Sequence, residues 1–235
     1  MDKNYTIGEN CEIASTAIIE EGCVIGNNVK IHHYAVLYPG TVIGDNCEIF
    51  EHTVIGRPPK AAGILVSKVG KDLPPVTIGD GTVVGASTVI YADCHIGANV
   101  MVGDLVMFRE CCYVGDNCVL GTCTNFNHHV TIGKNVKIVN FSHITSRSVV
   151  EDEVFVGVGV VSVNDRRMKQ DRELVDSRII LRKGCKIGSG AVLFPSVKVG
   201  ENAFVGANSV VSRDVERDTV VMGSPAKEKR KNENA

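Results

Sequence analysis

Polar residues that could bind a substrate or move a proton recur at a constant interval along the chain. The first set, in which each residue lies eighteen after the one before, is Glu110, His128, Ser146 and Asn164. The second set, one residue further on, is Cys111, His129, Arg147 and Asp165. An imidazole can act as a general base near neutral pH, and a carboxylate beside it can orient it and raise its basicity. If the fold brings residues of the first set together, they form a site for proton transfer.

A six-residue repeat explains this interval. Aliphatic or aromatic residues recur every six positions through residues 7–55, 78–156 and 181–211, and a small or β-branched residue precedes most of them by two positions. A short strand and a tight turn, repeated without helices, wind a chain into a parallel β-helix. Three hexads make one coil, so the sequence predicts about ten coils. Residues eighteen apart then stack at the spacing of neighbouring strands, about 4.8 Å, and both sets become columns at one exposed turn.

The composition favours the same fold class. The chain of 235 residues has 37 Val and 19 Ile against 8 Leu, and β-branched residues favour strands. A formal net charge of −2 gives no basic surplus for a nucleic-acid backbone. No run approaches the roughly 20 apolar residues of a membrane span, and the first fifteen residues do not resemble a signal peptide. We therefore expect a cytoplasmic all-β protein with no membrane span and no nucleic-acid partner.

The repeat also interprets the cysteines and divides the chain. The nine cysteines include no C-x-x-C pair, and seven occupy the small inward position, where free Cys packs as a small apolar side chain. These are Cys11, Cys23, Cys47, Cys94, Cys112, Cys118 and Cys185. We predict one β-helix domain over residues 1–226, with loop insertions at 57–75 and 165–180. The charged tail, 227–235, has no apolar periodicity, so we expect it to fray.

The end of the repeat resembles a known family. Residues 221–227 (V-M-G-S-P-A-K) resemble the closing V-x-G-x-P-A-K segment of hexapeptide-repeat acyltransferases, and the repeat itself resembles theirs over residues 5–226. The resemblance implies a left-handed parallel β-helix, a homotrimer, and acetyl-coenzyme A or another acyl-coenzyme A as co-substrate, with no metal.

Two subfamilies are similar around the first column. Residues 127–133 (N-H-H-V-T-I-G) resemble the N/A-H-x-x-x-I-G stretch of lipid A acyltransferases and nucleotide-4-amino-sugar N-acetyltransferases. That resemblance implies that His128 is the base and that the backbone N–H of Ser146 binds the thioester oxygen. Residues 136–140, 151–157 and 163–165 look like segments of 3-amino-sugar N-acyltransferases. This second resemblance implies that Asn164 lies at the sugar amine, and some of its members use the coenzyme A thiolate in place of a side-chain base.

Together these observations predict acyl transfer, with acetyl the expected group, from acyl-coenzyme A to the amine of a UDP- or dTDP-linked amino sugar for cell-surface glycan synthesis. The predicted catalytic residues are His128, Asn164 and Glu110. Coenzyme A is expected to contact Ser146, Arg178 and Lys183. The substrate is expected to contact Asn127, His143, Asp165 and Arg166. The basic residues 166–172 of the second insertion could bind phosphate or simply be solvated.

Other functions stay open or are excluded. O-acylation of a hydroxyl is the alternative within the same fold, and it would depend more strongly on an intact base. A zinc carbonic anhydrase on this fold needs an H-x-x-x-x-H pair, and no two of the seven histidines are five residues apart. A purely structural β-helix is disfavoured by the family-like carboxy terminus and by the two breaks in the repeat.

Overall fold

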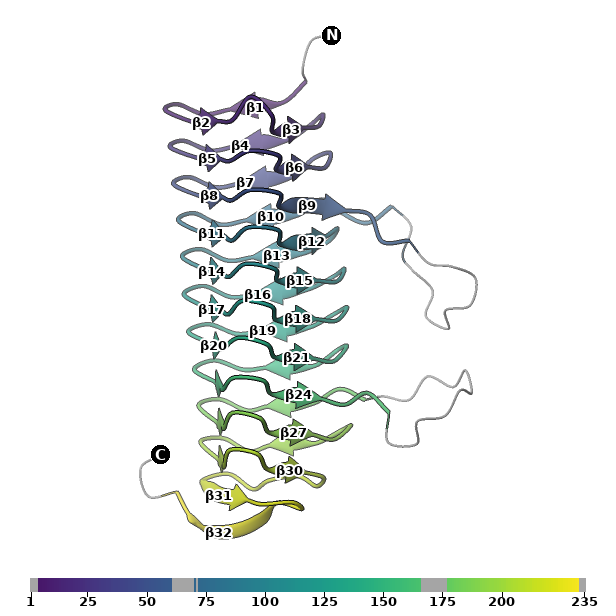
Figure 1. Cartoon of the computed structure of the whole chain (residues 1–235), viewed down its shortest axis with the longest axis vertical. Helices are drawn as coiled ribbons and strands as arrows, with labels where there is room; N and C mark the ends of the chain where they lie inside the picture. Colours follow the sequence, from purple (N-terminus) through teal and green to yellow (C-terminus); the bar gives the residue numbers. More distant parts are fainter. Residues whose placement is uncertain (1–3, 61–69, 71, 166–176, 233–235) are drawn as a thin grey trace.

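The chain winds into a stack of three-sided coils (Figure 1). The computed structural model describes residues 4–60, 70, 72–165 and 177–232. Each coil contributes short strands to three sheets, and strands of successive coils pair in parallel, with the antiparallel β32 at the carboxy terminus as the exception. No helix occurs in these described ranges. The fold is the all-β, left-handed parallel β-helix that the six-residue repeat and the family resemblance predict.

The sheets are numbered by their order in the first coil. Sheet 1 contains β1 (Thr6–Ile7), β4 (Val24–Ile25), β7 (Val42–Ile43), β10 (Thr77–Ile78), β13 (His95–Ile96), β16 (Tyr113–Val114), β19 (Thr131–Ile132), β22 (Val149–Val150), β25 (Ile180–Leu181) and β28 (Lys198–Val199). Sheet 2 contains β2 (Glu12–Ile13), β5 (Lys30–Ile31), β8 (Glu48–Ile49), β11 (Val83–Val84), β14 (Met101–Val102), β17 (Val119–Leu120), β20 (Lys137–Ile138), β23 (Phe155–Val156), β26 (Lys186–Ile187), β29 (Phe204–Val205), β31 (Thr219–Met222) and β32 (Lys227–Lys231). Sheet 3 contains β3 (Ile18–Ile19), β6 (Val36–Leu37), β9 (Val54–Arg57), β12 (Val89–Tyr91), β15 (Met107–Phe108), β18 (Asn125–Phe126), β21 (His143–Ile144), β24 (Val161–Ser162), β27 (Val192–Leu193) and β30 (Val210–Val211).

The register between coils is eighteen residues except across the two insertions and in the last coil, where Val205 pairs with Val221. Thr6 pairs with Val24, and the same offset joins Met107 to Asn125 in sheet 3. Across the first insertion Val42 pairs with Thr77, and across the second Val149 pairs with Ile180. The coils therefore resume the same register after each insertion, and columns of residues run along the whole stack.

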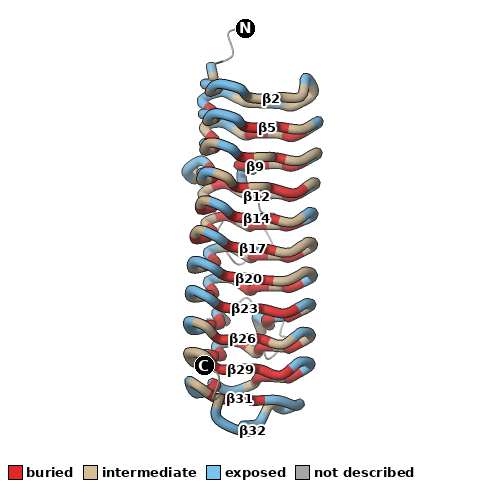
Figure 2. The backbone as a smooth tube through the Cα atoms, turned by 90° about the vertical axis from the view of Figure 1, so that its left-hand side faces the viewer, coloured by how far each residue is buried: buried red, intermediate tan, exposed pale blue. Residues whose placement is uncertain are grey.

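The core is the inside of the coil stack (Figure 2). The aliphatic position of each hexad is almost fully buried from the second coil onward, and Phe108 and Phe126 stack inside with ring centroids 4.6 Å apart. Six of the seven inward cysteines are buried as predicted, whereas Cys11 in the first coil is only half-buried. Turn residues with positive φ, such as Asn28 and Asn46, close the corners, a conformation that Asn adopts more readily than most residues.

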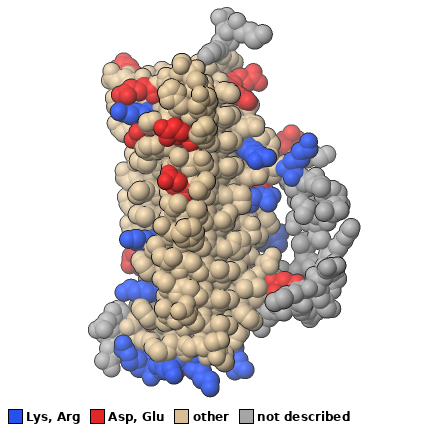
Figure 3. Space-filling model, viewed as in Figure 1, with Lys and Arg blue, Asp and Glu red and all other residues tan. Residues whose placement is uncertain are grey.

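The charged tail differs from expectation. Lys227–Lys231 does not fray but forms β32, which pairs antiparallel with β31. The backbone N–H and C=O groups along the free edge of β31 explain the pairing, because they offer hydrogen bonds that require no apolar side chains. All five residues of β32 are exposed, and lysine and arginine side chains gather at this end of the molecule (Figure 3).

The two insertions leave the stack at the same edge. β9 and β24 belong to sheet 3, and the chain departs beyond each of them (Figure 1). The predicted limits need a small correction, because Arg57 is the last residue of β9 and Ile180 is the first of β25. Most of both insertions, 61–69, 71 and 166–176, lies outside the described residues.

Candidate functional site

The polar columns lie on the edge from which the insertions depart. We call it the site edge: the turns that follow β15, β18, β21 and β24 of sheet 3. The backbone N–H of His129 donates to the carbonyl oxygen of Glu110 at 3.0 Å, and that of Arg147 donates to the carbonyl oxygen of His128 at 3.0 Å. Glu110, His128 and Ser146 therefore stack on consecutive coils, as the eighteen-residue spacing predicts.

Asn164 is the fourth member of the column. Its coil is held in register by the pairing of His143 with Val161. Asn164 is exposed and stands where the chain leaves for the second insertion. The inward position before it is Ser162, whose hydroxyl donates to the carbonyl oxygen of His143 at 2.9 Å and accepts from the N–H of Thr145 at 2.7 Å.

His128 is half-buried and makes its hydrogen bond to a second histidine. The Nδ1 atoms of His128 and His129 are 3.0 Å apart, and the rings meet edge to face with centroids 5.2 Å apart. One Nδ1 must carry a proton and the other must accept it. The Nε2 atom of His128 has no partner among the described residues, so it is available to a substrate.

The environment of His128 lowers its pKa below the ordinary value of 6.5. Burial is the main cause, and the nearby His129, Arg147 and Arg109 also disfavour the charged form, while Glu110 opposes them. Glu110 acts in the expected direction, toward a higher pKa of His128, but burial and the other neighbours outweigh it. His128 is neutral at pH 7, which is the form that can accept a proton.

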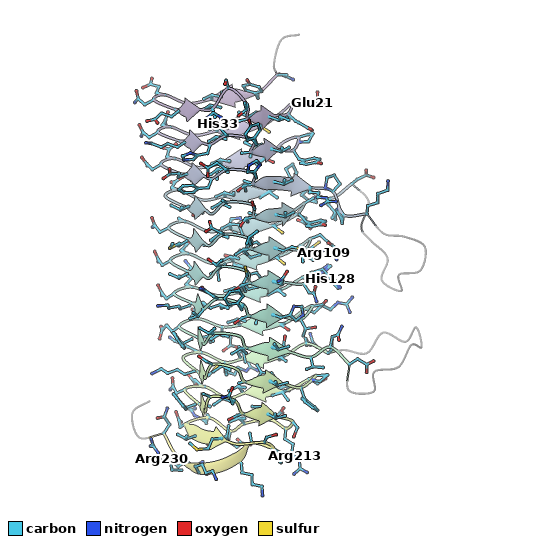
Figure 4. The ribbon with its side chains drawn as sticks, in the orientation of Figure 1. Glu21, His33, Arg109, His128, Arg213 and Arg230 are labelled. Carbon is cyan, nitrogen blue, oxygen red and sulfur yellow. The ribbon has the colours of Figure 1, made fainter. Side chains whose placement is uncertain are left out.

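Glu110 is buried, not exposed at the turn as the sequence suggested. Its relative exposure is 6%, and its carboxylate accepts two hydrogen bonds from Arg109, at 2.9 Å from Nε and 3.2 Å from Nη2. Figure 4 shows Arg109 and His128 at the same edge of the stack. The described residues contain no hydrogen bond between Glu110 and His128, because the guanidinium fork of the adjacent residue satisfies the carboxylate.

Arg109 is a site residue that sequence reasoning missed. Its guanidinium carbon lies 5.2 Å from the ring centroid of Tyr91, and that of Arg57 lies 5.5 Å from the same ring. Tyr91 and Arg109 are eighteen residues apart, so the repeat contains the signal that stacks them. Through Tyr91 and Arg109, the arrangement connects Arg57, where the first insertion begins, to the buried carboxylate of Glu110.

The residues predicted to bind the thioester oxygen or the substrate lie at different distances along the chain from the turn that holds His128, and three of them lie in turns of the site edge. Ser146 is half-buried, and its backbone N–H has no hydrogen bond to another described residue. Asn127 is half-buried beside His128, and its N–H donates to the carbonyl oxygen of Ile144 at 3.0 Å. His143 lies on the outer face of sheet 3 rather than in the turn, and burial lowers its pKa. Asp165 is half-buried at the start of the second insertion.

The basic residues predicted to bind coenzyme A separate into two groups. Since Val149 pairs with Ile180, Arg178 lies one coil beyond Arg147 in the column of His129, and both arginines are exposed. Lys183 lies on a different edge, after β25 of sheet 1, and pairs with Glu153 at 3.3 Å. Within one chain Lys183 is therefore not part of the site edge. Arg166 lies outside the described residues.

The described residues contain neither a group of metal ligands nor a membrane-spanning helix. Within the described ranges, no three His, Cys, Asp or Glu side chains lie where they could hold a metal ion together. In the same part of the chain, no helix is long and apolar enough to cross a membrane.

Comparisons with known proteins identify the family. Residues 4–37, 22–57 and 93–128 match the family described as bacterial transferase hexapeptide (six repeats), and residues 196–223 match the hexapeptide repeat of succinyl-transferase. The chain belongs to the hexapeptide-repeat acyltransferases.

Individual relatives match over shorter stretches or at low identity. The bifunctional protein GlmU of Shouchella clausii is 33% identical over 101 residues, which are 36% of this chain and 21% of that protein. A chloramphenicol acetyltransferase of Escherichia coli is 47% identical over 45 residues, 19% of this chain and 21% of that protein. The matched part thus spans about a fifth of the length of these curated relatives.

A solved structure extends the similarity of fold to nearly the whole chain. The UDP-N-acetylglucosamine acyltransferase from Campylobacter jejuni superposes with a TM-score of 0.58 at 18% identity, covering 98% of this chain and 72% of that one.

Proposed function

We propose that this protein transfers an acyl group from acyl-coenzyme A to the amine of a nucleotide-linked amino sugar at the site edge. The observation that carries the proposal is the stack of His128 below Ser146. Among the described residues, Nε2 of the neutral imidazole has no hydrogen-bond partner, and neither has the backbone N–H of Ser146 one coil away. Amide formation needs a base, an oxyanion donor and alignment of the two reactants. These two residues supply the first two requirements.

In the proposed reaction the amine nitrogen attacks the thioester carbon. Nε2 of His128 accepts the amine proton while Nδ1 stays bonded to His129. The N–H of Ser146 donates to the carbonyl oxygen as negative charge develops on it. The N–C bond forms, the C–S bond breaks, and the proton held by His128 passes to the leaving thiolate. The amide of Asn164, exposed at the end of the column, is proposed to hold the sugar.

The co-substrate and substrate classes rest on charge and on relatives. Arg147 and Arg178 are exposed on consecutive coils beside the column, which suits the phosphates of coenzyme A or of a nucleotide. One structure of similar fold is named a UDP-N-acetylglucosamine acyltransferase, and one relative that matches part of the chain is named a chloramphenicol acetyltransferase. We further propose a cytoplasmic homotrimer in which the site edge faces a neighbouring subunit.

O-acylation is a second candidate, favoured by one observation. A hydroxyl is a weaker nucleophile than a neutral amine and depends more on a general base. His128 combines a neutral state with a hydrogen bond at Nδ1 that fixes its ring. An enzyme that relied on the thiolate as base would need neither feature.

The experiment is a thiol-release assay with acetyl-coenzyme A against UDP- and dTDP-linked 3-amino and 4-amino sugars and the corresponding hydroxyl sugars. We expect turnover with at least one amino sugar and little with its hydroxyl counterpart. Turnover confined to hydroxyl sugars would replace the amine proposal with the O-acyl one. Absence of thiol release with every sugar, from protein that binds acetyl-coenzyme A, would contradict both.

A further inference from the structure

The buried carboxylate next to the candidate base has its hydrogen bonds directed away from that base. Glu110 stands one coil before His128 in the column, where it could have contacted the imidazole. Its side chain is 8% exposed, and Arg109 binds both of its oxygens. A buried carboxylate without a hydrogen-bond partner costs free energy. The position of Arg109 therefore determines whether Glu110 accepts hydrogen bonds from Arg109 or from another group.

Arg109 is itself packed against Tyr91, which lies one coil earlier. Its guanidinium packs on Tyr91 at 5.2 Å, and Arg57 packs on the same ring at 5.5 Å. Both contacts fall within the distance at which a cation is attracted to an aromatic face. The backbone supports the arrangement, because the N–H of Ala92 donates to the carbonyl oxygen of Arg57 at 3.0 Å. The two arginines and the ring of Tyr91 thus form a row of contacts from Arg57, at the end of β9, to the buried carboxylate of Glu110.

We propose that Arg109 is a positioning residue that binds Glu110 in competition with His128 and thereby keeps the candidate base uncharged. The inference rests on the proposed function for its catalytic meaning, although the competition itself is a property of the folded chain. When Arg109 is in place, His128 is left to bond with His129. If Arg109 were displaced, Glu110 would be free to accept a hydrogen bond from the imidazole and to stabilise its charged form.

The charged and titratable groups that face His128 come from three coils. They are Arg109 and Glu110 in the coil before, His129 in its own turn, and Arg147 in the coil after. Of these, only Glu110 favours a charged imidazole. The residue that positions Glu110 therefore determines how strongly this carboxylate favours the protonated form of His128.

The same geometry gives the first insertion a route to the site. Tyr91 is the single ring that both arginines share, and Arg57 is the residue from which that insertion departs. Among the described residues, a path of contacts runs from Arg57 through Tyr91 and Arg109 to Glu110, the residue one coil before His128.

The test is a titration of His128 in the full-length protein, followed by NMR of isotope-labelled histidine, with His128→Gln used to assign the signal. In Arg109→Gln we expect the pKa of His128 to rise by about 1 unit or more, as for an imidazole that gains a nearby carboxylate. Relative to Glu110→Gln alone, the double variant Arg109→Gln, Glu110→Gln should show only a small rise, the one expected for loss of a nearby cation. Arg147→Gln is the matched control, because it removes a cation from the coil on the other side of His128 without releasing Glu110, and it should give a smaller rise that persists with Glu110→Gln.

Two further variants keep the test informative if Arg109→Gln unfolds. Tyr91→Leu removes the ring and keeps every charge, so a rise in the pKa of His128 would support the role of this row of contacts. Tyr91→Phe should behave as wild type. An unchanged titration in both Arg109→Gln and Tyr91→Leu, or a rise in Arg109→Gln that Glu110→Gln does not reduce, would overturn the proposal. The titration needs no substrate, so absence of acyl transfer would contradict the proposed function without affecting this result.

Discussion

The imidazoles of His128 and His129 share a hydrogen bond between their Nδ1 atoms, which lie 3.0 Å apart. A catalytic histidine is commonly oriented through the ring nitrogen that does not face the substrate. Here that orienting partner is a second imidazole from the same turn, since the carboxylate predicted for this role is bound by Arg109. The candidate base and its hydrogen-bond partner are therefore neighbours in sequence rather than residues one coil apart.

Replacement of His128 tests the assignment of the base. We expect His128→Ala to lower kcat by about 10² to 10⁴ with little change in KM, because general-base catalysis contributes on that scale. Steady-state kinetics with the amino sugar identified by the thiol-release assay would measure it. If the leaving thiolate accepts the proton instead, kcat would stay within roughly tenfold of wild type, and Asn164→Ala would mainly raise KM.

The pH profile should reflect the lowered pKa of His128. A base acts only in its neutral form, so kcat/KM should fall as the pH decreases through the pKa of His128, which lies below 6.5, and should be flat above it. His129→Gln removes a neighbour that lowers this pKa, so the acidic limb should move to higher pH. An acidic limb that does not move in His129→Gln would contradict the electrostatic role of His129.

The stability of the fold should also depend on pH in the acidic range. His128 and His143 both have pKa values lowered by burial in the folded chain. Between the folded and unfolded pKa values the unfolded chain binds more protons, so the free energy of unfolding should decrease as the pH falls below about 6.5. Urea unfolding of wild type and His143→Gln at several pH values would measure it. A pH slope that His143→Gln does not reduce would contradict the contribution of His143.

The oligomeric state can be tested without a substrate, and a site shared between subunits can be tested by activity. We expect light scattering at low micromolar concentration to give three times the chain mass of 25.2 kDa. If the site edge meets a neighbouring chain, mixed trimers of His128→Ala and Asn164→Ala should regain part of the activity. A stable, active monomer would contradict the trimer. Failure of the mixed trimers to regain activity, with assembly intact, would confine the site to one chain.

The inward cysteines are expected to pack rather than react. Cys118 is 1% exposed, and burial raises its pKa, so it is poorly nucleophilic. Cys118→Ala should cost on the order of 1 kcal/mol of stability and leave turnover unchanged. Even the half-buried Cys111 has a pKa raised to about 12 by burial and by Asp93. Rapid inactivation by a thiol reagent, with protection by substrate, would contradict this assignment.

The sequence predicted positions along the coil better than it predicted the direction of side chains. The six-residue period gave the sheets and the stacking of Glu110, His128 and Ser146, because backbone register follows from local repeat length. It did not predict that Glu110 would be buried, since that depends on Arg109 and on a ring one coil earlier.

The carboxy terminus escaped prediction for another reason. β32 has no apolar period, and it pairs antiparallel through backbone groups that any sequence possesses. The six-residue repeat reflects the burial of side chains. A strand in which every residue is exposed therefore has no apolar periodicity by which it could be predicted.

The eighteen-residue register determines which insertions and deletions would preserve the site edge during evolution. A duplication or loss of one whole coil lengthens or shortens the stack but returns every later residue to the same edge, as the coils do after each insertion. A loss of one hexad would instead rotate every later side chain to the next edge and separate His128 from the residues before it. Relatives of this chain can therefore differ in length by whole coils and still share one site, whereas a slip of six residues between Arg109 and Ser146 would dismantle it.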